Sequence, residues 1–235
     1  LKAHKLHPEF RCYEDALEYI IHERNSQHRK QVVAEKQTAL LEDISKARLF
    51  RYQEKGVLFA VKAGRCILAD DMGLGKTLQT ICFLVDRLET IKDSIALIVC
   101  PSSLIYNWQQ EITKFAPHLR TYLHHGAARD ISNIACAKMD VCITSYGTMR
   151  SDIDQLSILH FDVAVIDESH NIKNPSAQST RAIYQLKVTS RVALSGTPVM
   201  NNTFDLCCRV CLAVKSFLNA NMQMLLTGTG TKKRY

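Results

Sequence analysis

Residues 69–77 form a glycine-rich stretch, Ala-Asp-Asp-Met-Gly-Leu-Gly-Lys-Thr, directly after the apolar run Cys66-Ile67-Leu68. Such a run predicts a buried strand, and the glycines after it let backbone N–H groups turn inward toward an anion. A helix that starts at this point adds the positive end of its dipole. The stretch therefore predicts a phosphate-binding loop between a strand and a helix, with a nucleoside triphosphate as its ligand.

The positions of this loop have separate expected roles. Gly73 and Gly75 allow the backbone to curl, Lys76 reaches the β- and γ-phosphates, and the Thr77 hydroxyl binds Mg²⁺. The strict pattern for such loops has a glycine where this chain has Asp70. A Gly-rich turn without a ligand is the alternative interpretation.

From about residue 46 the chain alternates short apolar runs with helical patterns, which is typical of an α/β fold with a parallel sheet and helices on both faces. We expect strands at residues 65–69, 95–99, 120–124, 141–145, 163–167 and 191–195. Residues 1–45 carry apolar residues at helical spacing and are expected to form a helical extension or linker. The α/β domain is expected to end near residue 206, which leaves 207–235 as a separate C-terminal segment.

A pair of acids follows another apolar run, since Val163-Ala164-Val165-Ile166 leads directly into Asp167 and Glu168. Ligands of parallel sheets bind at the carboxyl ends of the strands. One carboxylate there can hold Mg²⁺ while the other orients the attacking water. We expect this strand end to be the neighbour of the phosphate loop, and a solvated strand-end turn is the alternative.

Composition favours an intracellular protein with a polyanionic partner. The 235 residues contain 30 Lys and Arg against 23 Asp and Glu, a net charge of +7, although ordinary solubility explains such a charge equally well. No apolar span is long enough for a membrane helix, and no signal peptide is recognisable. Nine cysteines, mostly within apolar runs, suggest buried thiols in a reducing compartment.

Several segments, in order along the chain, resemble the motifs of the first (N-terminal) motor lobe of superfamily-two helicases, and among these of the Swi/Snf-type DNA-dependent ATPases. The segments are Arg51-Tyr52-Gln53, residues 70–77, residues 99–104 with Asn107-Trp108, Thr144-Ser145-Tyr146, residues 167–174, and residues 194–198 with Asn201-Asn202. Motifs in the correct order identify a family more specifically than any one of them. The resemblance covers roughly residues 46–206 and implies a RecA-like P-loop lobe that moves along double-stranded DNA without reading its sequence.

The resemblance also implies the cofactors ATP and Mg²⁺ and a role for each matching residue. Nucleotide binding falls to Gln53, which reads adenine, and to Asp71, Met72, Gly73, Leu74, Gly75, Lys76 and Thr77. Catalysis falls to Lys76, Asp167 and Glu168, with Thr77 and Asp167 as metal ligands. Coupling of the ATP site to DNA falls to His170, Ser195 and Thr197. DNA contacts fall to Pro101, Ser102, Ser103, Thr144, Ser145 and Tyr146, for which ordinary strand-to-helix turns are the alternative.

Two departures from the family pattern are minor. Ser169 stands where alanine is usual, and Ser195 stands where threonine is common, with a hydroxyl retained. A larger departure is that family members continue into a second lobe, which carries the arginine that reaches the γ-phosphate. We therefore expect the chain alone to be nearly inactive as an ATPase. The alternatives are a truncated lobe that serves as a DNA- or protein-binding module and, within the enzyme class, an RNA helicase.

Two further expectations concern Trp108 and a cluster of cysteines, to which no catalytic or binding role is assigned. Trp108 shares helical spacing with Leu104 and Ile112, so we expect it to pack in the interior and not to stack on a base. Cys207, Cys208 and Cys211 lack a second Cys or His pair, and we expect buried thiols there in preference to a zinc site. We expect other subunits or protein–DNA complexes as further partners, and no membrane. The expected location is the nucleus in a eukaryote and the cytoplasm or nucleoid in a bacterium.

Overall fold

The computed structural model describes Arg24 and residues 49–91, 93–127, 129–130, 139–172 and 177–196. Nearly all of the expected extension (residues 1–45) and the whole of the C-terminal segment (residues 207–235), with its three clustered cysteines, lie outside these ranges. Thr197 lies outside them as well.

The described residues form a sheet of six strands, every one of them parallel to its neighbours. The strands are β1 (Arg65–Leu68), β2 (Ala96–Cys100), β3 (Thr121–His124), β4 (Val141–Ser145), β5 (His160–Ile166) and β6 (Lys187–Leu194). Their order across the sheet is β1-β6-β5-β2-β4-β3. The predicted parallel sheet is confirmed, and each expected strand exists.

The order of strands corrects one expectation. The phosphate loop follows β1 and the acid pair follows β5, but these strands are not neighbours, because β6 pairs with both of them. The lengths of apolar runs cannot reveal such an insertion, because β6 comes after both β1 and β5 in the sequence. The end of β6 therefore lies between the phosphate loop and the acids.

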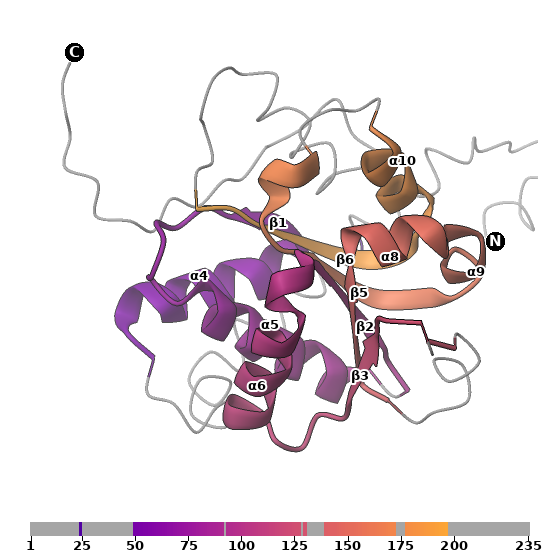
Figure 1. Cartoon of the computed structure of the whole chain (residues 1–235). Coiled ribbons are helices and arrows are strands. Elements are labelled where there is room, and N and C mark those ends of the chain that lie inside the picture. The colour runs from indigo at the N-terminus through magenta and orange to yellow at the C-terminus, as the bar shows by residue number, and fades with distance from the viewer. Residues whose placement is uncertain are drawn as a thin grey trace, which may run out of the picture.

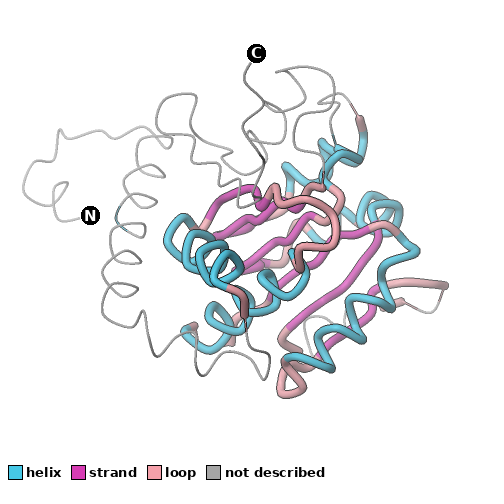
Figure 2. Tube along the Cα trace, turned by 90° about the vertical axis from the view of Figure 1, so that its left-hand side faces the viewer, coloured by secondary structure: helices cyan, strands magenta, loops and turns pink. Residues whose placement is uncertain are grey.

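Helices cover both faces of the sheet, as Figure 1 shows. On one face lie α4 (Arg51–Ala63), α5 (Lys76–Thr90) and α6 (Ile105–Phe115), and on the other lie α8 (Tyr146–Ser151), α9 (Ile153–Leu156) and α10 (Gln178–Gln185). Short 3₁₀ turns occupy η1 (Ser102–Leu104) and η2 (Ser169–Ile172). In Figure 2 the strands run side by side through the middle of the molecule, with helices on either side.

Each face has its own hydrophobic core. The first core joins the strands to α4, α5 and α6, and it contains Ile81, Leu84 and Trp108, each no more than 1% exposed. The second core lies beneath α8, α9 and α10 and contains Met149 and Phe161. Full burial of one such large side chain contributes roughly 1.5–3 kcal/mol, so the two cores hold the strand ends in fixed positions.

The four cysteines that the structure describes are buried in these cores, as expected. Burial raises the pKa of the Cys66 and Cys142 thiols to about 12, so both are neutral at physiological pH. Among the described residues, no helix has the length and apolar character needed to span a bilayer.

Candidate nucleotide site

The phosphate loop connects β1 to α5, and its backbone has the curled shape that the glycines were expected to allow. Gly73 and Gly75 have φ values of 83° and 75°, in the left-handed region that glycine adopts without strain. Lys76 is the first residue of α5, and its Nζ donates to the carbonyls of Asp70 at 2.8 Å and Asp71 at 2.9 Å. Thr77 follows in the first turn, so the ammonium and the hydroxyl lie at the positive end of the helix.

Asp70, which breaks the strict loop pattern, has a structural role. Its side chain is 1% exposed, and Oδ2 accepts a hydrogen bond of 2.8 Å from Nε2 of Gln79, one turn into α5. A buried carboxylate is retained only when it is hydrogen-bonded, and this bond links the start of the loop to the helix after it. Asp71, Met72 and Gly73 are exposed at the tip of the loop.

Gln53 lies beneath the loop and uses both ends of its amide. Oε1 accepts from the backbone N–H of Phe50 at 2.9 Å, and Nε2 donates to the carbonyl of Leu74 at 3.2 Å. The Tyr52 hydroxyl donates to the same carbonyl at 3.2 Å. Gln53 is 5% exposed, so it supports the loop from below, and reading adenine would require it to exchange one of these bonds.

The end of β6 completes the space beside the loop. The backbone N–H of Ser195 donates to the carbonyl of Leu68 at 3.1 Å, and the Ser195 residue is 1% exposed. A β-carbon on Gly196 would lie 2.8 Å from Cγ of Met72 and 3.9 Å from Nζ of Lys76. Residues 195–196, which include the expected coupling residue Ser195, therefore lie directly beside the phosphate loop.

Asp167, at the end of β5, is the most constrained acid of the site. Its Oδ2 accepts from the indole N–H of Trp108 at 2.8 Å, and its Oδ1 accepts from the N–H of Glu168 at 2.8 Å. Burial raises the pKa of Asp167 above its ordinary value, and the Trp108 and Glu168 N–H bonds and the charge of Lys76 offset only part of this effect. Since β1, β6 and β5 are parallel neighbours, Asp167 lies at the same edge of the sheet as the phosphate loop after β1.

Glu168 has a positive φ of 47°, which is uncommon for a residue other than glycine and is concentrated at functional sites. The backbone around it is held by Tyr146, whose hydroxyl donates to the Asp167 carbonyl at 2.5 Å. Burial and the nearby Asp167, Cys100 and Glu168 raise the pKa of Tyr146, so this hydroxyl remains a donor.

The donor set at this edge suits a magnesium–triphosphate. Mg²⁺ prefers oxygen ligands and usually takes one or two from the protein and the others from phosphates and water. Thr77 offers a hydroxyl and Asp167 a carboxylate, each of whose oxygens has a second lone pair. Within the described ranges, no cluster of three His, Cys, Asp or Glu residues could hold a metal, so phosphate oxygens would have to complete the shell.

The residues expected to contact DNA fall into two groups. Ser102 and Ser103 are exposed at the end of β2, with Pro101 half-buried before them. Thr144 is fully buried, and its hydroxyl donates to the His124 carbonyl at 2.9 Å, so a strand residue of this kind cannot offer its side chain to a phosphate. Ser145 is 6% exposed, and its Oγ accepts from the N–H of Thr148 as the N-cap of α8.

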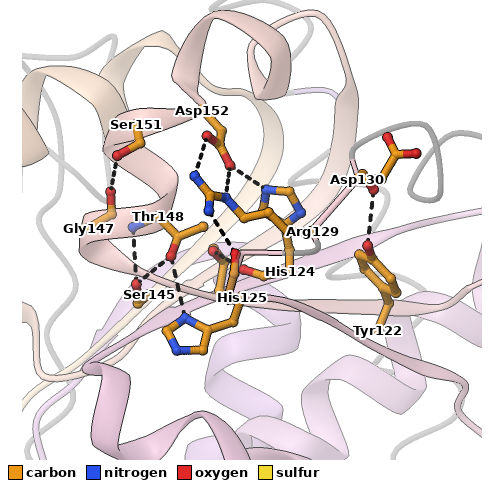
Figure 3. Close-up of polar contacts among 12 residues, drawn as sticks. Tyr122, His124, His125, Arg129, Asp130, Ser145, Gly147, Thr148, Ser151 and Asp152 are labelled. Atoms are coloured by element: carbon orange, nitrogen blue, oxygen red, sulfur yellow. Dashed lines mark hydrogen bonds and ion pairs between the residues drawn. The ribbon is translucent and has the colours of Figure 1, made fainter.

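A polar cluster beyond the ends of β3 and β4 was not expected from the sequence (Figure 3). Asp152 accepts from Nε and Nη2 of Arg129, at 2.6 and 3.1 Å, and lies 2.8 Å from Nε2 of the buried His124. Arg129 also donates to the Gly126 carbonyl at 2.7 Å. This cluster packs α8 against the loop after β3, next to Ser145. The only signal in the sequence was a histidine at a strand end, which is an ordinary position for a core residue.

His170 lies in η2, close along the chain to the acid pair. Among the other residues that sequence reasoning missed, Gln79 supports the loop and the indole N–H of Trp108 contacts Asp167. The burial of Trp108, which is 1% exposed, confirms its expected place in the core. Helical spacing predicted that burial but carries no information about which polar atom a ring nitrogen will meet.

Comparisons with known proteins agree with this geometry. A family model described as the SNF2-related domain matches residues 13–220. The structure titled "Sulfolobus solfataricus SWI2/SNF2 ATPase core in complex with dsDNA" superposes with a TM-score of 0.66 at 38% sequence identity, over 72% of this chain and 36% of that chain.

Two curated relatives extend the comparison. TATA-binding protein-associated factor mot1 of Schizosaccharomyces pombe is 39% identical over 178 residues, which is 68% of this chain and 9% of that protein. DNA excision repair protein ERCC-6-like 2 of Mus musculus is 32% identical over 202 residues, 73% of this chain and 13% of that protein. The chain therefore spans a small part of the length of these relatives.

Proposed function

The chain belongs to the SNF2-related family of ATPase domains, and on that premise we propose that it is the ATP-binding lobe of a translocase that hydrolyses ATP to move along double-stranded DNA. With a second lobe in place, such movement remodels protein–DNA complexes. One observation carries the proposal: the phosphate loop, the end of β6 and the acid pair follow three adjacent parallel strands and so lie at one edge of the sheet, where Gly196 lies beside Lys76.

In the proposed reaction Lys76 gives up its hydrogen bonds to the carbonyls of Asp70 and Asp71 and binds the β- and γ-phosphates instead. Thr77 and Asp167 would hold Mg²⁺, which when bound would neutralise charge on the phosphates. Glu168 orients the attacking water and accepts its proton. Gln53 holds the carbonyl of Leu74 and so keeps the loop in shape around the nucleotide.

The end of β6 is the proposed coupling segment. Ser195 is bonded to β1 through its backbone and precedes Gly196, which lies beside Lys76. Loss of the γ-phosphate would change the surroundings of Lys76 and thus of this segment. We place His170 and Thr197 in the same coupling role on the basis of the family motif alone.

DNA contact is proposed at the loops after β2 and β4, through Pro101, Ser102, Ser103, Ser145 and Tyr146. The exposed hydroxyls of Ser102 and Ser103, and backbone N–H groups of both loops, suit phosphate oxygens, and such contacts position a protein without reading sequence. The net charge of +7 and the double-stranded DNA in the complex of the Sulfolobus relative support this assignment. Thr144 contributes through its place in β4 and not through its buried hydroxyl.

As an isolated polypeptide the chain is proposed to bind ATP weakly and to hydrolyse it very slowly. Phosphoryl transfer depends on charge stabilisation from both sides of the cleft, and a trans-acting arginine contributes roughly three to five orders of magnitude in related systems. This chain covers only 36% of the length of the Sulfolobus ATPase core. A lobe that only binds DNA or protein has no use for Lys76, Asp167 and Glu168, and their convergence favours the enzyme.

The decisive experiment measures binding of a fluorescent ATP analogue to the chain, with Mg²⁺, for the wild type and for Lys76→Ala. Loss of the ammonium removes the charge that holds the phosphates, and binding should weaken at least tenfold, since one charged hydrogen bond is worth about 1.5–3 kcal/mol. Lys62→Ala, a half-buried lysine in the last turn of α4, is the control. Equal affinity of the wild type and Lys76→Ala would refute the nucleotide site.

A further inference from the structure

Asp167 is held from both faces of the sheet. Trp108 lies on α6 in the first core and donates its indole N–H to the Asp167 side chain at 2.8 Å. Tyr146 begins α8 on the opposite face and donates its hydroxyl to the Asp167 backbone carbonyl at 2.5 Å. The same residue therefore has both its carboxylate and its peptide group fixed by aromatic donors from different layers.

Both aromatic donors are connected to the loops that we propose to contact DNA, since Trp108 follows the first loop and Tyr146 is part of the second. Ser102 and Ser103 are exposed, and the chain continues from them through η1 into α6, where Trp108 lies one turn after the start. Tyr146 is the residue after Ser145, the N-cap of α8. Each segment therefore begins at the carboxyl edge of the sheet, and its aromatic residue donates a hydrogen bond to Asp167.

We propose that Trp108 and Tyr146 are positioning residues through which DNA contact at these two loops sets the orientation of the metal-binding Asp167. The inference rests on the proposed function, because it requires that the loops bind DNA and that Asp167 holds Mg²⁺. Neither aromatic residue touches the reacting atoms. Their effect is on the carboxylate, whose two oxygens are already directed by the indole N–H and by the N–H of Glu168.

The physical basis is the steep dependence of a hydrogen bond on distance and angle. A small movement of the start of α6 or α8 shifts a donor relative to β5, and the buried carboxylate turns with it because water cannot replace the bond. Binding of DNA and binding of Mg²⁺–nucleotide are then coupled, and the coupling is reciprocal. We expect duplex DNA to tighten Mg²⁺–nucleotide binding by about fivefold or more, the lower end of typical coupling between sites.

The chain provides its own probe, since Trp108 is its one tryptophan. Emission of an indole responds to charge and hydrogen bonding at the ring. Addition of Mg²⁺ with a non-hydrolysable ATP analogue should change the emission of the whole chain, and chelation of Mg²⁺ should reverse the change. An analogue labelled on its ribose, detected by its own fluorescence, measures binding independently of the tryptophan.

The second arm compares affinities for the labelled analogue, with and without a duplex DNA oligonucleotide, in three variants. Trp108→Phe removes the indole N–H and keeps most of the ring volume, and Tyr146→Phe removes only the hydroxyl. Both should reduce the DNA-induced gain in affinity to less than half of that in the wild type. Tyr106→Phe, at a tyrosine of α6 that is 61% exposed, is the matched control and should keep the full gain.

The outcomes separate the two hypotheses. If the wild-type chain fails to bind the labelled analogue, or fails to bind duplex DNA, the proposed function is overturned. Normal binding of both ligands, with an unchanged tryptophan emission or with full coupling in Trp108→Phe and Tyr146→Phe, overturns this inference and leaves the proposed function intact. Thermal unfolding of each variant ensures that the coupling is compared between folded proteins.

Discussion

The side-chain amide of Gln53 donates to the backbone carbonyl of Leu74 at 3.2 Å, and this bond ties the first turn of α4 to the phosphate loop. The same amide leaves no room for a side chain at the neighbouring loop position. A β-carbon on Gly75 would lie 2.4 Å from Nε2 of Gln53. The loop therefore depends on glycine at this position for two reasons, its positive φ and the close approach of Gln53.

Substitution of two glycines separates these reasons. Gly75→Ala should lower the free energy of unfolding by roughly 2–3 kcal/mol, because it combines left-handed strain with the clash. Gly73→Ala should cost only about 1–2 kcal/mol, because its φ of 83° is equally strained but nothing lies within 4 Å of the added carbon. Denaturant unfolding of both variants measures the difference, and equal losses would contradict the role of Gln53.

Glu168→Gln tests the assignment of the water-orienting acid. The amide keeps the shape of the side chain but cannot accept a proton, so turnover should fall by about two to four orders of magnitude. Binding of Mg²⁺–ATP should remain. The measurement is DNA-stimulated ATP hydrolysis by the natural full-length protein.

Glu89→Gln is the control for this substitution, since Glu89 is exposed near the end of α5 and pairs with His118. It should leave hydrolysis unchanged. Wild-type rates in Glu168→Gln would show that another residue activates water.

The cluster around Asp152 predicts a pH-dependent stability. Hydrogen bonds from Arg129, and then from His124, lower the pKa of Asp152 below its ordinary 3.8. A lowered pKa in the folded state stabilises the protein above the ordinary value, and this contribution disappears as the pH falls through the folded-state pKa.

Asp152→Asn should therefore lower the free energy of unfolding by about 2 kcal/mol at neutral pH, the value of a hydrogen bond to a charged group. The difference from the wild type should shrink as the pH falls below 3.8 and through the folded-state pKa. Denaturant unfolding at neutral pH and over a series of acidic pH values measures it. Asp154→Asn, two residues away and exposed, is the control, and a similar loss in both variants would argue against the cluster.

Binding to duplex DNA should be insensitive to sequence and should weaken steeply with salt, because phosphate contacts release counterions. Ser102→Asp places a negative charge at the exposed loop after β2 and should weaken binding roughly fivefold, equivalent to the ~1 kcal/mol of one charge pair at about 4 Å in water. Thr113→Asp adds the same charge to the exposed side of α6. Fluorescence anisotropy of a labelled duplex measures both, and equal weakening would indicate a nonspecific charge effect.

The sequence predicted the strands well where they are apolar and less well where they are polar. For β5 and β6 it predicted starts at residues 163 and 191, but these strands begin at His160 and Lys187. Their first residues pair with each other in register, and Asp162 accepts a hydrogen bond from the N–H of Ile95. Polar residues whose hydrogen-bonding groups are paired with a neighbouring strand show no pattern in the sequence that would mark them as part of a strand.

Other features depended on contacts that no local pattern encodes. No distinct helix was predicted at α4, whose central run from Val57 to Val61 is continuously apolar and could equally indicate a strand. The motifs predicted which residues gather at the site. They did not predict that Trp108 and Tyr146 would contact Asp167, because that requires the order of the strands and the tilt of the helices.

The late position of β6 in the chain has a consequence for biosynthesis. In the described sheet β1 pairs with β6 alone, although more than a hundred residues separate them, and β6 also connects β1 to the four strands on its other side. A nascent polypeptide in which β6 has not yet left the ribosome leaves β1 without a partner. We therefore expect that ATP cannot assist folding of this lobe until β6 has emerged, and that the lobe acquires its nucleotide affinity in that one step.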